Sequence, residues 1–184
     1  GKSVSTPAVK SEVHEGDEET ELLEPARATF HRAMTARGIY LSQDRSEIGF
    51  AVEGLSRGMA RPREDNWNAL KRFARYLVGR EREVKTFRYQ KRPGGIEVWT
   101  DTDYAGCRRT RKSTSGGVVT RGSHAIKTWS SAQAVIALSS GEAECYGMVK
   151  GGSVGLGMKA LMNDLGVEVG IKIMTDASAA KSSA

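Results

Sequence analysis

The order of short strands and one long helix in the second half of the chain constrains the fold more than any other feature. Residues 96–101 alternate between apolar and polar side chains, and short runs rich in β-branched or aromatic residues follow at 115–121 and 124–130. A long helical segment covers 139–165, and a strand-like run at 167–176 comes after it. Short turns predict that the first three strands are antiparallel, whereas the helix permits the fourth strand to lie parallel to the first. We therefore expect an α/β fold with a mixed sheet.

The region before these strands has the periodicity of helices. Two helices are expected between residues 25 and 58, the second of them from the spacing of Ile48, Ala51, Val52 and Leu55. Another is expected over 62–79, because Pro62 and two acids stand at its start and Gly79 at its end. Its buried stripe is predicted to consist of Trp67, Leu70, Ala74 and Leu77.

Three segments follow from these patterns. Residues 1–24 are predicted to form an acidic flexible linker, because their hydrophobicity is low and they show no helical or strand period. Residues 25–92 form a mainly helical, basic region, and residues 93–184 form the α/β domain. The last stretch, 177–184, is expected to begin a further helix.

Positive charge is concentrated in the part of the chain that follows residue 24. The formal net charge is +6, but residues 1–24 hold seven of the 22 acids and only two of the 28 Lys and Arg residues, which leaves 26 − 15 = +11 on the remainder. Such a surplus is typical of proteins that bind polyanions, and of nucleic-acid-binding proteins in particular. The side chains expected to contact phosphate groups are Lys71, Arg72, Arg75, Arg111 and Lys112.

Neither a membrane segment nor a targeting signal is predicted. The sequence has no run of ~18 apolar residues, and its N-terminus lacks the basic and then apolar pattern of a signal peptide. Cys107 and Cys145 have no spacing typical of a zinc site or a disulfide framework. We therefore expect an intracellular protein, in the cytoplasm or the nucleus, that does not bind a membrane.

Three acidic residues stand where α/β folds commonly build sites. Asp101 ends the first predicted strand, Glu144 lies near the start of the long helix, and Asp176 ends the fourth strand. Each acid taken singly is more often a turn or capping residue. If the first and fourth strands are parallel neighbours, however, all three meet at one edge of the sheet. Carboxylates so close repel one another unless a cation holds them together, and such oxygen ligands suit Mg²⁺ or Mn²⁺.

Short stretches around these acids carry a family resemblance. They are DTDYAG (101–106), RKSTSGG (111–117), ALSSGEAE (137–144) and IKIMTDASA (171–179). In this order they resemble the ribonuclease H domain of copia-type LTR retrotransposon Pol polyproteins. Upstream stretches resemble the segment that joins the reverse transcriptase to that domain; they are VSTP (4–7), FHRAM (30–34), RSEIGFAVEGLSRGM (45–59) and NWNALKRFARYLVG (66–79).

The resemblance implies a ribonuclease H-like mixed sheet preceded by a mainly helical connection region. It matches Asp101, Glu144 and Asp176 to the first three of the family's four catalytic carboxylates, whereas Asp103 and Glu142 match non-catalytic positions. Enzymes of this family use Mg²⁺ to cut the RNA strand of an RNA–DNA hybrid, so the resemblance also implies the substrate. Because the sequence stops eight residues after Asp176, we expect a truncated domain without the fourth carboxylate.

Two functions stay open on the sequence alone. The first is an RNA–DNA hybrid ribonuclease that hydrolyses a phosphodiester with two metal ions. The second is a catalytically inactive, nucleic-acid-binding remnant of a retroelement, favoured by the glycines of residues 139–165. Five of them follow Glu144, and at roughly 1 kcal/mol each they are expected to weaken that helix by about 5 kcal/mol.

Overall fold

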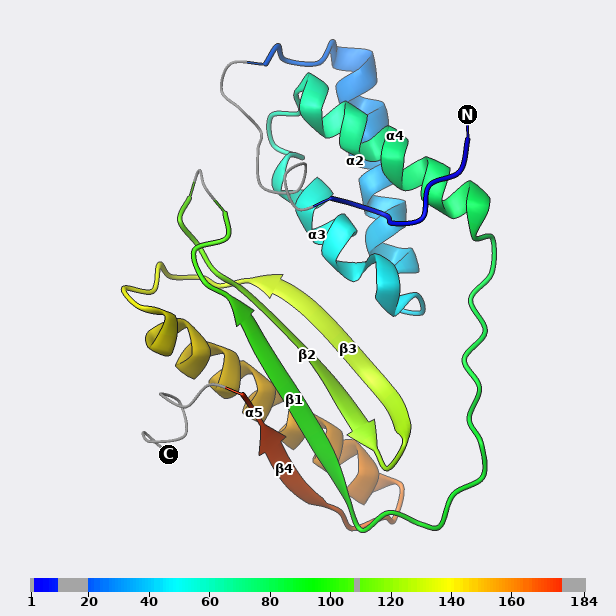
Figure 1. Cartoon of the computed structure of the whole chain (residues 1–184), viewed down its shortest axis with the longest axis vertical. Helices are drawn as coiled ribbons and strands as arrows, with labels where there is room; N and C mark the ends of the chain where they lie inside the picture. The colour runs from blue at the N-terminus through cyan, green and yellow to red at the C-terminus, as the bar shows by residue number, and fades with distance from the viewer. Residues whose placement is uncertain (1, 10–19, 108–109, 177–184) are drawn as a thin grey trace. The chain divides into compact units, whose positions relative to one another are not determined.

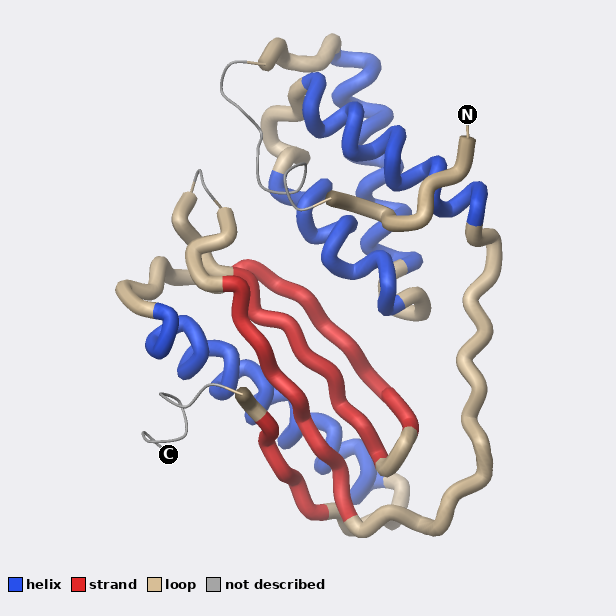
Figure 2. The backbone as a smooth tube through the Cα atoms, viewed as in Figure 1, coloured by secondary structure: helices blue, strands red, loops and turns tan. Residues whose placement is uncertain are grey.

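A computed structural model describes residues 2–9, 20–107 and 110–176 of the chain (Figures 1 and 2). The chain divides into two compact units, which consist mainly of Gly1–Lys85 and of Thr86–Gly106 with Thr110–Ala184. The helix expected over 177–184 lies outside the described residues, as do residues 10–19 of the predicted linker.

The first unit is helical, as the sequence predicts. It contains α2 (Pro25–Leu41), the 3₁₀ turn η1 (Ser46–Ile48), α3 (Gly49–Arg57) and α4 (Glu64–Gly79). The buried core between these helices consists of Ile48, Ala51, Val52, Leu55, Leu70, Phe73 and Tyr76. The helical stripe predicted before residue 58 is therefore confirmed.

The buried face of α4 differs from the predicted one. Its buried residues are Leu70, Phe73 and Tyr76, whereas Ala74 is exposed and Trp67 and Leu77 are half-buried. α4 carries apolar residues around more than half of its circumference, so periodicity alone left open which face meets α3. The buried face is the one that carries Phe73 and Tyr76, two aromatic rings that each bury a large apolar area. Trp67 lies at the edge and packs against Phe30, with ring centroids 5.9 Å apart.

The described ends of the predicted linker pack on the first unit. Val4 and Ala8 contact its core, and Leu23 is buried. Leu22 forms an isolated antiparallel bridge with Arg63 just before α4. The linker prediction therefore now concerns only residues 10–19.

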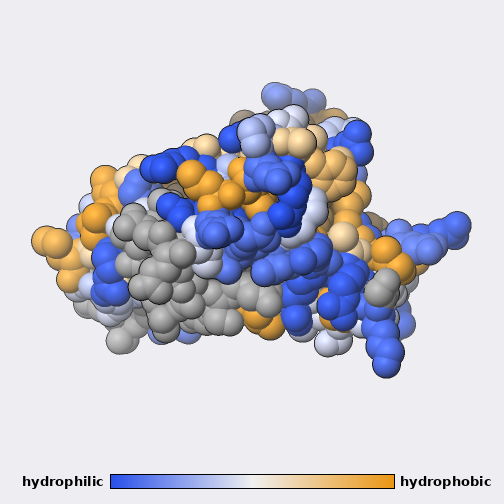
Figure 3. Space-filling view, turned by 90° about the horizontal axis from the view of Figure 1, so that it is seen from above, coloured by the Kyte–Doolittle hydropathy of each residue, from blue (hydrophilic) through white to orange (hydrophobic). Residues whose placement is uncertain are grey.

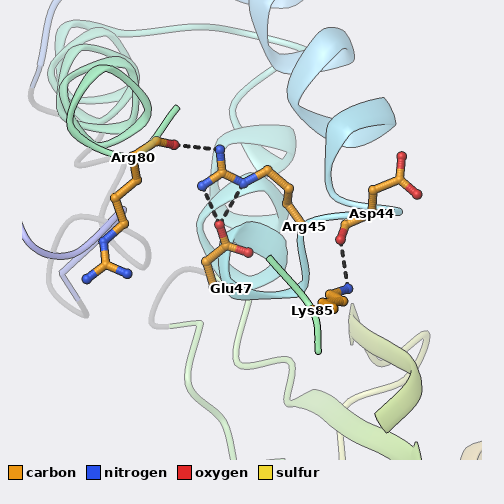
Figure 4. A network of polar contacts seen from close by, with 5 residues as sticks. All are labelled: Asp44, Arg45, Glu47, Arg80 and Lys85. Carbon is orange, nitrogen blue, oxygen red and sulfur yellow. Dashed lines mark hydrogen bonds and ion pairs between the residues drawn. The ribbon is translucent and has the colours of Figure 1, made fainter. Parts of the chain in front are cut away.

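The segment between α4 and the sheet has neither helix nor strand, and its first part is held to the first unit. Arg45 is buried, and it donates hydrogen bonds to Glu47 Oε1 (2.7 Å) and to the backbone carbonyl of Arg80 (2.8 Å). Lys85 Nζ donates to the carbonyl of Asp44 at 2.7 Å. Figure 4 shows these contacts converging on the start of the segment. Residues 80–85 are thereby fixed to the helices although they form no regular element.

The second unit is a mixed four-stranded sheet covered by one helix. The strands are β1 (Gly95–Asp103), β2 (Thr114–Arg121), β3 (His124–Ala132) and β4 (Gly170–Met174), in the order β3-β2-β1-β4. β1, β2 and β3 are antiparallel neighbours, whereas β4 pairs parallel with β1. The helix α5 (Ser140–Asp164) packs across the sheet (Figure 1). The predicted α/β class and mixed sheet are confirmed, in the arrangement expected of a ribonuclease H-like domain.

The glycines of α5 have a role that the sequence analysis missed. The helix runs unbroken for 25 residues, and Gly147, Gly151 and Gly155 are buried on its inner face. A Cβ atom at Gly147 would lie 2.5 Å from Thr102 Oγ1, and one at Gly151 would lie 2.3 Å from Thr100 Cγ2. These glycines let the helix lie close against β1, so burial against the sheet offsets their poor helix propensity.

The surface is consistent with the high content of charged residues, 27% of the chain. The face visible in Figure 3 is largely hydrophilic, with apolar residues in scattered patches. Among the described residues, no helix combines the length and the apolar composition that crossing a bilayer requires.

Candidate carboxylate site at the edge of the sheet

Asp101 lies on the face of β1 that is turned away from the core. The strand alternates strictly from Ile96 onward, with Ile96, Val98, Thr100 and Thr102 buried and the residues between them more exposed. Asp101 is therefore exposed beside buried neighbours, and the backbone N–H of Thr102 donates to its Oδ1 at 2.8 Å. This hydrogen bond orients the carboxylate at the end of the strand.

Asp176 follows the end of β4, the strand that lies beside β1 in the sheet. β1 and β4 pair in parallel from Gly95↔Gly170 to Trp99↔Met174. β4 ends at Met174, so Asp176 lies two residues beyond the strand that the sequence predicts to reach it. Asp101 lies inside β1, two residues before its end at Asp103. The two aspartates are therefore near the carboxyl ends of neighbouring parallel strands, and their sharing of one site stays a prediction.

Glu144 lies in the first turns of α5, and the start of this helix fixes its position. The N-cap residue Ser139 accepts a hydrogen bond from the backbone of Glu142 at 3.1 Å, and Glu142 Oε2 accepts one from the backbone of Leu138 at 2.8 Å. This reciprocal arrangement is a capping box shifted by one residue. Glu142 therefore serves as the capping acid that its position suggests, and Glu144 lies two residues further into the helix.

The charges of the three acids interact. Burial raises the pKa of Glu144 above its ordinary value, and the negative charges of Asp101 and Asp176 raise it further, whereas a hydrogen bond from the Thr102 backbone acts in the opposite direction. Glu144 Oε2 is buried and has no hydrogen-bond partner. The charges of Asp101 and Asp176 thus reach Glu144, although the three acids come from distant parts of the sequence. Asp103 ends β1, and its carbonyl accepts from Gly106 at 3.4 Å within the following turn.

The three carboxylates are suitable ligands for a divalent cation, although their side chains do not surround a common point. In the described part of the chain, no three His, Cys, Asp or Glu side chains converge closely enough to hold a metal ion as they stand. The donor set of three carboxylates nevertheless suits Mg²⁺ or Mn²⁺, and the buried Glu144 Oε2 lacks a partner that a cation would supply. A bound ion would draw the carboxylates together and relieve their mutual repulsion.

A buried polar cluster beneath the acids escaped the sequence analysis. Gln133 Nε2 donates to the carbonyl of Ala143 at 2.8 Å and to Ser115 Oγ at 2.9 Å. Thr102 Oγ1 approaches the same carbonyl at 3.4 Å. Gln133 lies between a strand and a helix, so no repeating pattern of apolar residues indicates that it is buried. The one signal in the sequence is a polar residue with apolar neighbours.

The predicted phosphate-binding residues occupy separate places. Arg72 Nη2 donates to Thr6 Oγ1 at 2.9 Å, and Arg75 Nε donates to the carbonyl of Lys2 at 2.6 Å. Lys71, on another face of α4, lines an apolar groove of about 350 Å³ between α2 and α4. Arg111 and Lys112 belong to the second unit, just before β2, where Arg111 has a left-handed backbone conformation. The five residues thus form at least two groups, and their contact with nucleic acid stays a prediction.

Curated retrotransposon proteins match nearly the whole chain. The retrovirus-related Pol polyproteins from transposons RE2 and RE1 of Arabidopsis thaliana are 32% and 31% identical to it over 171 and 168 residues, and each match spans 91% of this chain. The chain is a relative of retrotransposon Pol polyproteins. The predicted resemblance to Pol polyproteins of copia-type elements is thereby confirmed.

A third match and the coverage define how far this relationship extends. The retrovirus-related Pol polyprotein from transposon TNT 1-94 of Nicotiana tabacum is 32% identical over 127 residues, or 67% of this chain. The chain spans only 11%, 11% and 9% of the length of the three polyproteins. No family model matches this Pol relative, and no solved structure does.

Proposed function

We propose that this Pol relative contains the carboxylate core of a ribonuclease H, which hydrolyses the RNA strand of an RNA–DNA hybrid. The observation that carries the proposal is the shared electrostatics of the site: Asp101 and Asp176 both raise the pKa of Glu144, although the three acids come from three different elements. An acid whose pKa is raised by burial and by acids from distant parts of the sequence is a candidate for a functional site. The relationship to Pol polyproteins supports this choice of reaction and substrate.

In this proposal the residues of the chain hold and orient the reacting groups. Asp101, Glu144 and Asp176 would bind Mg²⁺ or Mn²⁺, and such an ion supplies activation of a water and stabilisation of the leaving oxygen. Thr102 keeps the Asp101 carboxylate in place through its N–H. The capped start of α5 holds Glu144 at the same edge, and the positive charge of the chain attracts the phosphate backbone.

The test is hybrid cleavage by Asp101→Asn. This substitution removes one carboxylate charge and keeps the size of the side chain, so Mg²⁺-dependent cleavage of the RNA strand should fall by at least about 100-fold. Asp103→Asn is the matched control on the same strand and should keep activity within about threefold. Because the chain spans about a tenth of the polyproteins it matches, the same variants are also assayed in a protein extended by its downstream coding sequence.

The outcomes separate this proposal from its alternative. Unchanged cleavage by Asp101→Asn in the extended protein would contradict the assignment of the site. An extended wild type that binds hybrids in a salt-sensitive manner but cleaves none at any Mg²⁺ or Mn²⁺ concentration would favour an inactive nucleic-acid-binding remnant. That alternative is favoured by one observation, the lack of a ready metal-binding trio among the described side chains.

A further inference from the structure

Gln133 is a buried amide whose orientation is set by its partners. It follows the last residue of β3, is only 8% exposed, and donates from Nε2 to the carbonyl of Ala143 and to Ser115 Oγ. Because a backbone carbonyl only accepts hydrogen bonds, the nitrogen and not the oxygen of the amide must face Ala143. Gln133 Oε1 is buried without a partner, so the polar contacts of this side chain are made by its nitrogen.

The backbone of Gln133 is anchored as firmly as its side chain. Its N–H donates to the carbonyl of Ser113 at 2.8 Å. Ser113 is itself fully buried, and its Oγ accepts from the backbone of Ala105 at 3.0 Å, in the turn after β1. Gln133 therefore connects the start of β2 and the end of β1 to the first turn of α5.

The carbonyl that Gln133 holds belongs to the residue before Glu144. Thr102, on β1, also donates to that carbonyl through its Oγ1. The backbone N–H of Thr102 donates to Asp101 and orients its carboxylate. Gly147, one turn further along α5, lies against Thr102 with no room for a side chain. The position of Glu144 relative to Asp101 is therefore set by contacts among Gln133, Thr102 and the helix backbone.

The hydrogen bond from Gln133 to the Ala143 carbonyl opposes the electrostatic repulsion between the acids. Three carboxylates at one edge repel one another, and the repulsion acts to push the start of α5 away from β1 and β4. Apolar packing is nondirectional, and Gly147 and Gly151 have no side chain to interlock. A hydrogen bond from a buried, rigidly anchored amide to the helix backbone resists displacement in a defined direction.

We infer that Gln133 is a positioning residue for the carboxylate site: through the Ala143 carbonyl it holds Glu144 where a divalent cation can bind it together with Asp101 and Asp176. The inference rests on the proposed function, because it assigns the purpose of the cluster to the metal site. Gln133 itself contacts neither the cation nor the substrate.

The test measures Mn²⁺ binding by the full chain, followed by the electron paramagnetic resonance signal of the free ion. Gln133→Met keeps the length of the side chain and removes both donated hydrogen bonds. We expect it to weaken Mn²⁺ affinity by about tenfold or more, as is typical when a group that orients a metal ligand is lost. Hydrogen exchange of the amides of residues 143–147 should become faster in the same variant.

Gln90 provides a matched control at the other end of the sheet. Its Nε2 donates to the carbonyl of Arg121 at 2.9 Å and its Oε1 accepts from Ser123 at 2.9 Å, at the turn between β2 and β3. Gln90→Met therefore removes a comparable amide contact far from the acids. It should lower the melting temperature of the second unit and leave Mn²⁺ affinity within about twofold of the wild type.

Each outcome decides the inference. Wild-type Mn²⁺ affinity in Gln133→Met, or an equal loss in Gln90→Met, would overturn the positioning role while leaving the proposed function intact. A wild-type chain that binds no Mn²⁺ would overturn the proposed function and this inference with it. If Gln133→Met does not fold, Gln133→Asn, which keeps the amide but is shorter by one methylene, is judged by the same two criteria.

Discussion

At the scale of single residues, buried polar groups without hydrogen-bond partners lower the stability of the fold. His31 is fully buried in the first unit, and neither of its ring nitrogens has a hydrogen-bond partner. Burial lowers the pKa of His31 below its ordinary value of 6.5, and the charge of Arg32 lowers it further. The folded chain therefore holds this imidazole neutral in a pH range where the unfolded chain protonates it.

The pH dependence of stability follows from this shift. Below pH ~6.5 the unfolded chain binds a proton at His31 that the folded chain does not, so the free energy of unfolding must fall as the pH falls. We expect the first unit to lose stability as the pH falls below ~6.5, and His31→Leu to flatten that dependence. Urea unfolding of both proteins across this range measures it. Equal slopes in the two proteins would show that other groups dominate.

At the scale of elements, the contact between α5 and β1 depends on missing side chains. The alternation of β1 directs Val98, Thr100 and Thr102 toward the helix, and glycines at intervals of four residues receive them. A helix with ordinary side chains at these positions would stand further from the strand. The distance between Glu144 and the aspartates therefore depends on the glycines as much as on the acids.

Two alanine substitutions on α5 separate these effects. Gly151→Ala places a Cβ 2.3 Å from Thr100 Cγ2, and because Thr100 is β-branched and buried it has little freedom to move. We expect a net destabilisation of about 1–3 kcal/mol from overpacking. Gly157→Ala meets nothing within 4 Å, so it should stabilise the helix by up to ~1 kcal/mol. Thermal unfolding checks both, and a stabilising Gly151→Ala would contradict the close approach.

At the scale of the whole molecule, two cores are joined by a segment without regular structure. The first core lies among α3, η1 and α4, and the second lies between the sheet and α5. Residues 80–85 are held to the first unit by Arg45 and Asp44, whereas Gln90 is hydrogen-bonded to the turn between β2 and β3. Only a few residues around Arg88 lie between these two anchors.

Limited trypsin digestion tests this organisation. Cleavage should occur first after the Lys and Arg residues of 86–92, which are exposed and follow the last anchor to the first unit, and it should leave two protected fragments. Mass spectrometry of the early products locates the cut. If the first cuts fell within α4 or α5 instead, the two units would not be independently stable.

The sequence by itself determined the class of the fold and singled out the three acids of the candidate site. Alternation in β1, helical spacing around Ile48 and capping residues at Ser139 and Glu142 are patterns within short stretches of sequence, so they can be read without knowledge of the tertiary contacts. The order of the stretches around Asp101, Glu144 and Asp176 identified the relationship to Pol polyproteins before any geometry was known.

Tertiary structure alone decided the features that depend on contacts between distant residues. The parallel pairing of β1 with β4 made the strands that carry or precede Asp101 and Asp176 neighbours, and burial of the Phe73 and Tyr76 face of α4 depended on how the helices pack. The glycines of α5 seemed a weakness in the sequence because helix propensity is measured without a neighbouring sheet. The role of Gln133 is visible only once Ser115 and Ala143 lie beside it, since a hydrogen bond between distant residues leaves no periodic trace in the sequence.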